Sequence, residues 1–212
     1  MKQIRKRLFI NPKMSPWERG KTIYLAVENG CNTLVFSFND KFFNNTMKRY
    51  KKLIKTYALN IEAGGRDLPL LLPKKMFHTN RELFRMEQGE RKKSPHFCPT
   101  NPSTIKTITE NTHKWFDHIL QKVTEPRVIH ILPEEGHENT WCSCPACRAF
   151  SPAEQYLIAA NTVADTLAKY DLDARLCYID LDTEPDAEGI SPRKNMIANS
   201  AIDNEVFLQV SD

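Results

Sequence analysis

Three glutamates follow a predicted strand in the middle of the chain. Residues 127–132 are rich in apolar and β-branched side chains, and Glu134, Glu135 and Glu138 come soon after them. A buried strand that ends in exposed acids is how α/β enzymes present catalytic groups, because the strand is rigid and the loop is accessible. Paired carboxylates suit glycoside hydrolysis, in which one group protonates the leaving oxygen and the other attacks or orients the nucleophile. We therefore predict that Glu134 or Glu135 is a general acid; a solvated acidic loop is the alternative.

A second pair of carboxylates follows the next predicted strand. Residues 174–179 form a β-prone run that ends at Asp180 and Asp182. Neighbouring residues of an extended chain point to opposite faces, so only one of Glu134 and Glu135 is expected to face a site. Asp180 or Asp182 is then predicted to assist it as the second catalytic carboxylate.

Three of the six cysteines lie in one short motif, Cys142-x-Cys144-x-x-Cys147. Thiolates at this spacing can share one structural Zn²⁺, with His137 or Cys98 as candidates for the fourth ligand. The usual zinc signature has two separated pairs, whereas this chain has a single cluster. The alternative is therefore a thiol-rich turn whose sulfurs pack as small apolar groups. The chemistry of the acids requires no cofactor.

Six further residues are predicted to bind substrate because they lie at strand ends or near the acids and cysteines. They are Asn39, Asp40, Arg66, His137, Trp141 and Arg148. An indole ring can stack on the apolar face of a sugar, and an arginine can bind a sugar carboxylate. His137 is a candidate proton carrier, sugar contact or metal ligand. The alternatives are core packing for the tryptophan and plain solvent exposure for the polar residues.

Strands and helices are predicted to alternate, which favours βα units and a parallel sheet with helices outside it. Strands are expected near Leu8, Val35, Ile61, Ile129, Leu176 and Phe207, and helices over 15–28, 45–57, 80–88, 105–123, 152–167 and 194–201. A TIM-type (β/α) barrel would bring the polar strand ends together on one rim, and a doubly wound sheet would also gather them at one edge. With about five to six βα units, we expect residues 1–212 to form a single, incomplete TIM-type barrel domain with an irregular insertion at about 68–100.

The net charge of +4 hides an asymmetry between the halves of the chain. Residues 1–100 hold 21 Lys and Arg against 8 Asp and Glu, a net of +13, whereas residues 101–212 have a net of −9. A basic half can bind nucleic acid, but these residues fall on predicted helix faces and loops without a nucleic-acid motif. Nucleic acid is therefore disfavoured as a partner, and a carbohydrate is expected. A non-catalytic carbohydrate-binding domain and a zinc-bearing basic module are the two alternatives to an enzyme.

No run of residues is long and apolar enough to predict a membrane span, so no membrane partner is expected. The basic start is like the first part of a signal peptide, but Asn11, Pro12 and Lys13 interrupt the apolar residues that follow. We expect the chain to be cytoplasmic if Met1 is the native start. An unclosed sheet would leave edge strands exposed, and a homodimer is one way to cover them.

A family resemblance appears around the cysteine motif. Residues 141–148, WCSCPACR, with PEEG at 133–136 before them and Asn161 after them, resemble a poorly characterised family of glycoside-hydrolase-type barrels. Members of that family are similar in outline to α-glucuronidases and β-N-acetylhexosaminidases. The run FCPTNP at 97–102 and the glycine pair at 64–65 fit the same family.

The resemblance covers roughly residues 17–185 and implies a TIM-type barrel that acts on a carbohydrate. It also implies that the acid after the fourth strand, Glu134 or Glu135, is the proton donor. Hexosaminidases carry Asp-Glu where this chain has Glu-Glu. Many relatives show Gly-Gly-His where this chain has Gly-Gly followed by Arg66.

Overall fold

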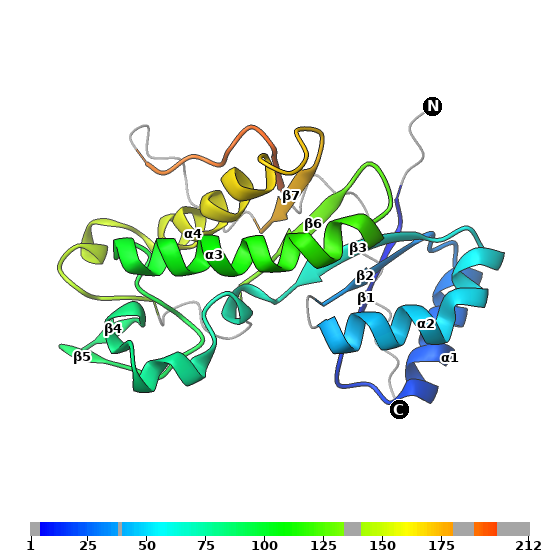
Figure 1. Cartoon of the computed structure of the whole chain (residues 1–212), viewed down its shortest axis with the longest axis horizontal. Helices are drawn as coiled ribbons and strands as arrows, with labels where there is room; N and C mark the ends of the chain where they lie inside the picture. The colour runs from blue at the N-terminus through cyan, green and yellow to red at the C-terminus, as the bar shows by residue number, and fades with distance from the viewer. Residues whose placement is uncertain (1–4, 38–39, 134–140, 180–188, 199–212) are drawn as a thin grey trace.

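The computed structural model describes residues 5–37, 40–133, 141–179 and 189–198 (Figure 1). These residues form a six-stranded sheet, a two-stranded hairpin and four α-helices. The sheet contains, in order, β1 (Arg7–Ile10), β2 (Thr33–Phe36), β3 (Asn60–Gly65), β6 (Val128–Ile131), β7 (Arg175–Tyr178) and β8 (Met196–Ala198). Every neighbouring pair of these strands is parallel.

The strands lie in the sheet in the same order as in the chain. A doubly wound sheet reverses its order at a switch point, and the described strands show no reversal. Successive βα units laid side by side are the arrangement from which (β/α) barrels are built. The predicted α/β class is confirmed, and closure into a barrel stays a prediction.

Five of the predicted strands occur at their predicted positions, whereas the strand predicted near Phe207 lies outside the described residues. The helix predicted over 194–201 is wrong for its described part, because Met196–Ala198 is strand β8. Pairing of Ile197 with Cys177 of β7 determines the conformation here. Strand formation depends on the neighbouring strand as much as on local sequence, which is why the sequence pattern alone was misleading.

Four helices connect these strands or follow them. They are α1 (Pro16–Glu28), α2 (Asp40–Thr56), α3 (Pro102–Ile119) and α4 (Pro152–Leu167). Ser15 and Ser151 form the capping boxes that their sequences suggest, each with the glutamate three residues later. Figure 1 shows α1 and α2 together at one end of the sheet, while α3 and α4 pack against each other.

The two faces of the sheet differ in chemistry. One face packs on the helices in a single apolar core, to which Leu8, Leu34, Ile61, Ile129 and Leu176 contribute from the strands and Ile23, Phe43, Phe116 and Tyr156 from the helices. The register places Phe9, Val35 and Glu62 side by side on the other face. This second face therefore carries a buried carboxylate, and its packing must satisfy that charge.

The sheet is strongly curled. Phe9 on β1 and His130 on β6 are separated by two intervening strands, which in a flat sheet would hold their backbones about 14 Å apart. Their ring centroids are nevertheless only 5.0 Å apart, at an interplanar angle of 82°. The face that carries Phe9, Glu62 and His130 is therefore concave, and the helices cover the convex face.

The segment between β3 and α3 includes residues 68–100, for which an irregular insertion was predicted, and we refer to it as the insertion. It contains three short 3₁₀ helices, Leu68–Leu70, Lys74–His78 and Arg81–Leu83, and a hairpin of β4 (Met86–Glu87) and β5 (Glu90–Arg91). Buried Leu71, Leu72, Phe84 and Phe97 attach the insertion to the main core.

The helix predicted over 80–88 is wrong beyond Leu83. Gln88 and Gly89 have φ angles of 49° and 81° and join β4 to β5 in a two-residue turn. Positive φ at both central residues is typical of the tight hairpin turn that matches strand twist, and it is incompatible with a right-handed helix.

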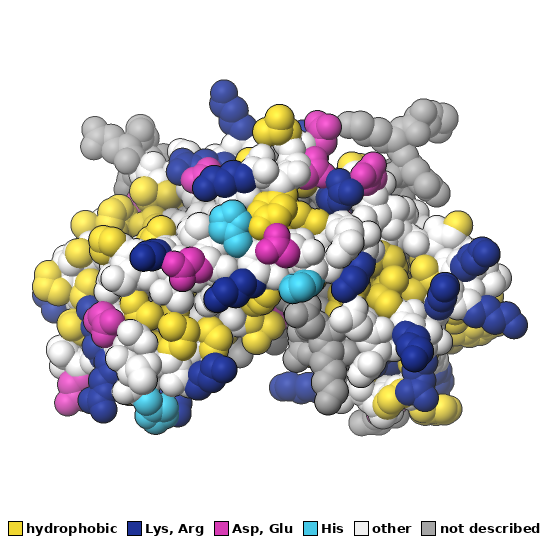
Figure 2. Space-filling model, in the orientation of Figure 1, with side chains coloured by type: hydrophobic (Ala, Val, Ile, Leu, Met, Phe, Trp, Pro, Cys, Tyr) yellow, Lys and Arg dark blue, Asp and Glu magenta, His cyan; other side chains and the backbone are white. Residues whose placement is uncertain are grey.

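Figure 2 shows Lys and Arg side chains gathered at the end of the molecule where Figure 1 draws α1 and α2. The exposed basic residues of α2 are Lys48, Arg49, Lys51, Lys52 and Lys55. In the described parts of the chain, helices are too short or too polar to span a membrane.

Candidate functional site

The backbone that leads to the predicted general acids is held at the carboxyl end of β6. The Leu132 N–H donates to the Gly65 carbonyl at 2.8 Å, and Arg66 Nη1 donates to the Pro133 carbonyl at 3.1 Å. Both contacts join the end of β6 to the end of β3. Arg66, predicted to bind substrate, therefore has a described contact with the chain just before Glu134.

Most of the predicted site lies beyond the described residues. Glu134, Glu135, His137, Asp180, Asp182 and Asn39 all fall outside the described ranges, and Asp40 opens α2 without a described side chain. Their predicted roles are therefore untested. The structure does describe the strands β2, β6 and β7, which these residues follow in the sequence.

Tyr156 of α4 joins the ends of two neighbouring strands. Its hydroxyl donates to the Ile131 carbonyl of β6 at 2.5 Å and accepts from the Ile179 N–H after β7 at 3.2 Å. The ring is fully buried, and burial raises the pKa of Tyr156, so the hydroxyl stays protonated as a donor. Tyr156 was not among the predicted site residues.

Asp67 and Ser37 form another contact at the same edge. Ser37 Oγ donates to Asp67 Oδ1 at 2.7 Å, which joins the segments after β2 and β3. The Asp67 side chain is buried although it carries a carboxylate. Its position directly after a strand was the available sequence signal, but Asp67 was not among the predicted site residues.

Trp141 is buried, with 8% of its surface exposed. Its ring lies 4.8 Å from the His96 ring and 6.4 Å from the Tyr156 ring, measured between centroids. This packing favours the alternative of a core residue over an open sugar platform. Arg148 is exposed, and its Nε donates to the Ser143 carbonyl at 2.9 Å. Substrate binding by either residue stays a prediction.

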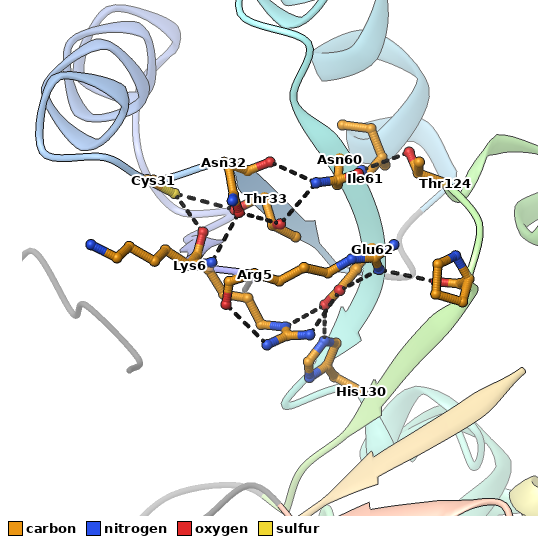
Figure 3. Close-up of polar contacts among 12 residues, drawn as sticks. Arg5, Lys6, Cys31, Asn32, Thr33, Asn60, Ile61, Glu62, Thr124 and His130 are labelled. Atoms are coloured by element: carbon orange, nitrogen blue, oxygen red, sulfur yellow. Dashed lines mark hydrogen bonds and ion pairs between the residues drawn. The ribbon is translucent and has the colours of Figure 1, made fainter. Parts of the chain in front are cut away.

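A buried charge network lies around Glu62 of β3 (Figure 3). Glu62 accepts hydrogen bonds from Arg5 Nη1 at 2.8 Å, Arg7 Nε at 2.7 Å and His130 Nε2 at 2.6 Å. The side chains of Glu62 and His130 are fully buried. One oxygen of Glu62 faces both Arg7 Nε and His130 Nε2. Because an ionised carboxylate can only accept hydrogen bonds, His130 carries a proton on Nε2.

The network sets the charge state of Glu62. Burial alone would raise the pKa of Glu62, but hydrogen bonds from His130 and Arg7 and the charges of these groups outweigh it and lower the pKa to about 2. His130 Nδ1 is buried and has no hydrogen-bond partner among the described residues. The sequence signal for a buried ion pair was a charged residue within an apolar strand, but the partners of Glu62 lie far from it in the sequence.

The cysteine motif converges with a fourth cysteine from the insertion. Cys98, Cys142, Cys144 and Cys147 are all buried, and their sulfur atoms lie within 4.8 Å of one another. Cys98 Sγ is 3.6 Å from Cys144 Sγ and 3.7 Å from Cys147 Sγ. This four-cysteine group can hold a metal ion such as zinc. Of the two residues predicted as candidates for the fourth ligand, Cys98 belongs to the group. His137, the other candidate, is outside the described residues.

The motif is held in shape by its own turn and by α4. The Cys144 carbonyl accepts from the N–H groups of Cys147 and Arg148, both at 3.0 Å. Gln155 of α4 accepts from the Cys142 N–H at 3.0 Å and donates to the Cys142 and Cys147 carbonyls at 3.2 Å. The backbone of the motif is therefore held by contacts that do not involve a metal.

The close contacts between the sulfurs shift thiol pKa values in opposite directions. Hydrogen bonds from Cys142 and Cys147 lower the pKa of Cys98 far below that of a free thiol, while contacts with Cys142 and Cys98 raise the pKa of Cys147. Ionising all of these thiols at such short range requires a cation to offset their charge.

Sequence comparison finds no matching family model and no matching curated protein. Structure comparison finds similarity to the tandem GH20 catalytic modules of the pneumococcal exo-β-D-N-acetylglucosaminidase StrH, with a TM-score of 0.58 and 12% identity. It also finds similarity to the α-galactosidase from Lactobacillus brevis, with a TM-score of 0.50 and 7% identity. The fold is glycoside-hydrolase-like.

These similarities cover 91% and 82% of this chain but only 58% and 26% of the two solved chains. Identities this low show the fold alone, so the resemblance predicted from the sequence is supported at the level of a distant glycoside-hydrolase-like fold. The narrower family stays a prediction. In parallel α/β sheets, closed or open, ligands bind at the carboxyl ends of the strands, so the ends of β3, β6 and β7 are the candidate site.

Proposed function

We propose that this chain is a carbohydrate-active domain of the glycoside-hydrolase type, with Glu134 or Glu135 as its general acid. One observation supports this most strongly: the backbone at Pro133 is held at the carboxyl end of a central strand in a glycoside-hydrolase-like fold. Both glutamates follow Pro133 directly in the sequence. Catalytic residues of barrel enzymes come from such strand ends.

The two glutamates have different roles in this proposal. Adjacent residues of an extended chain point to opposite sides, so one carboxyl group turns toward the site and the other away. The one that faces the site protonates the glycosidic oxygen as the leaving group departs. The other carboxylate contributes to the structure of the loop.

The second catalytic carboxylate is Asp180 or Asp182. Both follow β7, which pairs with β6, and parallel neighbours lie about 4.8 Å apart at their ends. Retaining glycosidases hold their two carboxyl groups about 5–5.5 Å apart, and inverting enzymes hold them about 6.5–9.5 Å apart. Acids from neighbouring strands can satisfy either spacing.

A TIM-type barrel is the architecture that this function would use. The described residues supply six parallel strands in sequential order, and a TIM barrel has eight. The contact between Phe9 and His130 across two intervening strands supports curvature of the barrel kind. In the proposal, the concave face with Glu62 is the barrel interior.

The substrates to test first follow from the similar proteins. The two solved structures are named as an exo-β-D-N-acetylglucosaminidase and an α-galactosidase, and the sequence resemblance adds α-glucuronidases. Chromogenic aryl glycosides of these three sugars therefore form the first panel. Hydrolysis of at least one of them by the wild-type chain is the expected result.

Glutamine variants of the two acids test the assignment. Replacing the general acid should lower the rate by about 10²–10⁴, while replacing its neighbour should change it little. Glu138→Gln is the matched control, because it removes a carboxylate from the same segment. Similar small effects of Glu134→Gln and Glu135→Gln would refute the assignment. Binding of sugars without any hydrolysis would favour the non-catalytic alternative.

A further inference from the structure

We propose that Cys98, Cys142, Cys144 and Cys147 bind one Zn²⁺ in a closed tetrahedral site, and that this ion joins the insertion to the segment after β6. The proposal is independent of any glycosidase activity. It rests on the spacing of the sulfurs, on the donors around them and on what the site connects.

The sulfur spacing is that of metal ligands. A tetrahedral zinc ion with Zn–S bonds of about 2.3 Å places its sulfurs about 3.8 Å apart. Cys98 Sγ lies 3.6 and 3.7 Å from the sulfurs of Cys144 and Cys147. A disulfide would require about 2.05 Å, and all four cysteines are free. Zinc binding forms four Zn–S bonds and releases the thiol protons to solvent.

Donors around the sulfurs suit a site with excess negative charge. Four thiolates and one Zn²⁺ carry a net charge of 2−, which outer hydrogen bonds normally offset. The Met86 N–H donates to Cys142 Sγ at 3.2 Å, and Arg91 Nη1 lies 3.8 Å from the same sulfur. Thr100 Oγ1 lies 3.1 Å from Cys147 Sγ. Simple packing of thiols as apolar groups would not call for these donors.

The site joins two segments that are distant in the sequence. Cys98 belongs to the insertion, and the other ligands follow β6. The four cysteines form a buried cluster of their own, separate from the main core, with partly buried Met86 packed against it. Apart from the sulfurs, the Met86 carbonyl accepts from both the N–H and the hydroxyl of Ser143 at 2.8 Å.

The ion is structural in this proposal rather than catalytic. Catalytic zinc sites keep one position open for water or substrate, whereas four protein sulfurs fill a tetrahedral site. Removal of the ion should loosen hairpin β4–β5 and the segment around Cys144 first. The parallel sheet should persist, because its core does not include the four cysteines.

Metal analysis of the native protein is the first test. Protein purified without chelator should contain about one zinc per chain, and a strong chelator should lower its melting temperature reversibly. Replacement by Co²⁺ should give the absorption bands of a tetrahedral site with thiolate-to-cobalt charge transfer. Stoichiometric iron in place of zinc would overturn the identity of the ion.

Two serine variants make the test specific. Cys98→Ser should lower the thiolate-to-cobalt band by about a quarter and reduce zinc retention, since one of four sulfurs is lost. Cys31→Ser is the control: Cys31 is also buried, but its thiol donates to the carbonyls of Lys6 and Thr33 and lies outside the group. Cys31→Ser should retain zinc and the full band.

Three further results would overturn the proposal. They are native protein without stoichiometric metal, chelator treatment without effect on stability, and a Cys98→Ser protein with an unchanged cobalt spectrum. The last would mean that another residue completes the site. Should Cys98→Ser fail to fold, the metal content and chelator response of the wild-type chain still decide the question.

Discussion

Replacement of Glu62 by glutamine should destabilise the protein severely. The change keeps the size of the side chain but removes the negative charge to which Arg5, Arg7 and His130 donate. Glu62 is fully buried, and the side chains of Arg5 and Arg7 are only 12% and 8% exposed. Water therefore cannot replace the lost anion easily, and two guanidinium groups are left without their partner.

Two arguments give the same magnitude for the free energy of unfolding that Glu62→Gln should lose. Removing one partner of a buried ion pair typically costs about 3–5 kcal/mol. Independently, the pKa of Glu62 falls from 4.5 to about 2 on folding, which corresponds to about 3 kcal/mol of stabilisation at neutral pH. We therefore expect Glu62→Gln to lose about 3–5 kcal/mol of unfolding free energy at pH 7.

The same pKa predicts how stability depends on pH. A carboxyl group with a lowered pKa in the folded state contributes fully above its unfolded pKa and loses its contribution as the pH falls toward the folded value. For Glu62 this window runs from 4.5 down to about 2. About 2 kcal/mol of its contribution should be lost by pH 3, and Glu62→Gln should lack this component.

Urea unfolding at pH 7 and at several acidic pH values measures both effects. The comparison holds if the slope of the unfolding free energy against urea concentration is the same in wild type and variant. Glu87→Gln is the control, because Glu87 also pairs with an arginine, Arg85 at 3.0 Å, but is 47% exposed. It should shift stability by about 0.5 kcal/mol or less. A Glu62→Gln protein with wild-type stability and pH dependence would refute the reasoning.

Two further substitutions test the architecture around the candidate site. Gly64→Ala should destabilise the protein strongly or prevent folding, because a Cβ at Gly64 would lie 1.9 Å from the His130 carbonyl oxygen. Gly89→Ala is the control: Gly89 also has a positive φ but faces open space, so this change should cost about 1–2 kcal/mol in thermal unfolding. Tyr156→Phe should cost about 1–3 kcal/mol in urea unfolding, because it leaves the buried Ile131 carbonyl without its donor; an unchanged midpoint would show that this contact contributes nothing.

The sequence predicts the regular part of this fold well because its strands are short apolar runs. Strands such as β2 and β6 are buried on both faces, and the continuous apolar pattern of such strands is visible without knowledge of their neighbours. Strand β8 and hairpin β4–β5 were missed for different reasons. The first depends on pairing with β7, and the second depends on a turn with positive φ at Gln88.

The candidate site is predictable only where its residues are close in sequence. Cys142, Cys144 and Cys147 form a recognisable motif, but the approach of Cys98 to them is visible only in the three-dimensional structure. The Glu62 network illustrates the same limit. A carboxylate within a strand indicates that a partner exists, but the order of the strands and the curvature of the sheet determine which residues can reach it.

The dependence of hydrolysis on the leaving group tests the central proposal most directly. A general acid matters when the departing oxygen needs a proton, and it matters little when the leaving phenol is already strongly acidic. The less active of Glu134→Gln and Glu135→Gln should lose about 10²–10⁴ in rate on a phenyl glycoside and keep nearly wild-type rates on the dinitrophenyl glycoside of the same sugar. Equal losses on both substrates, or no loss on either, would contradict the assignment of a general acid directly after β6.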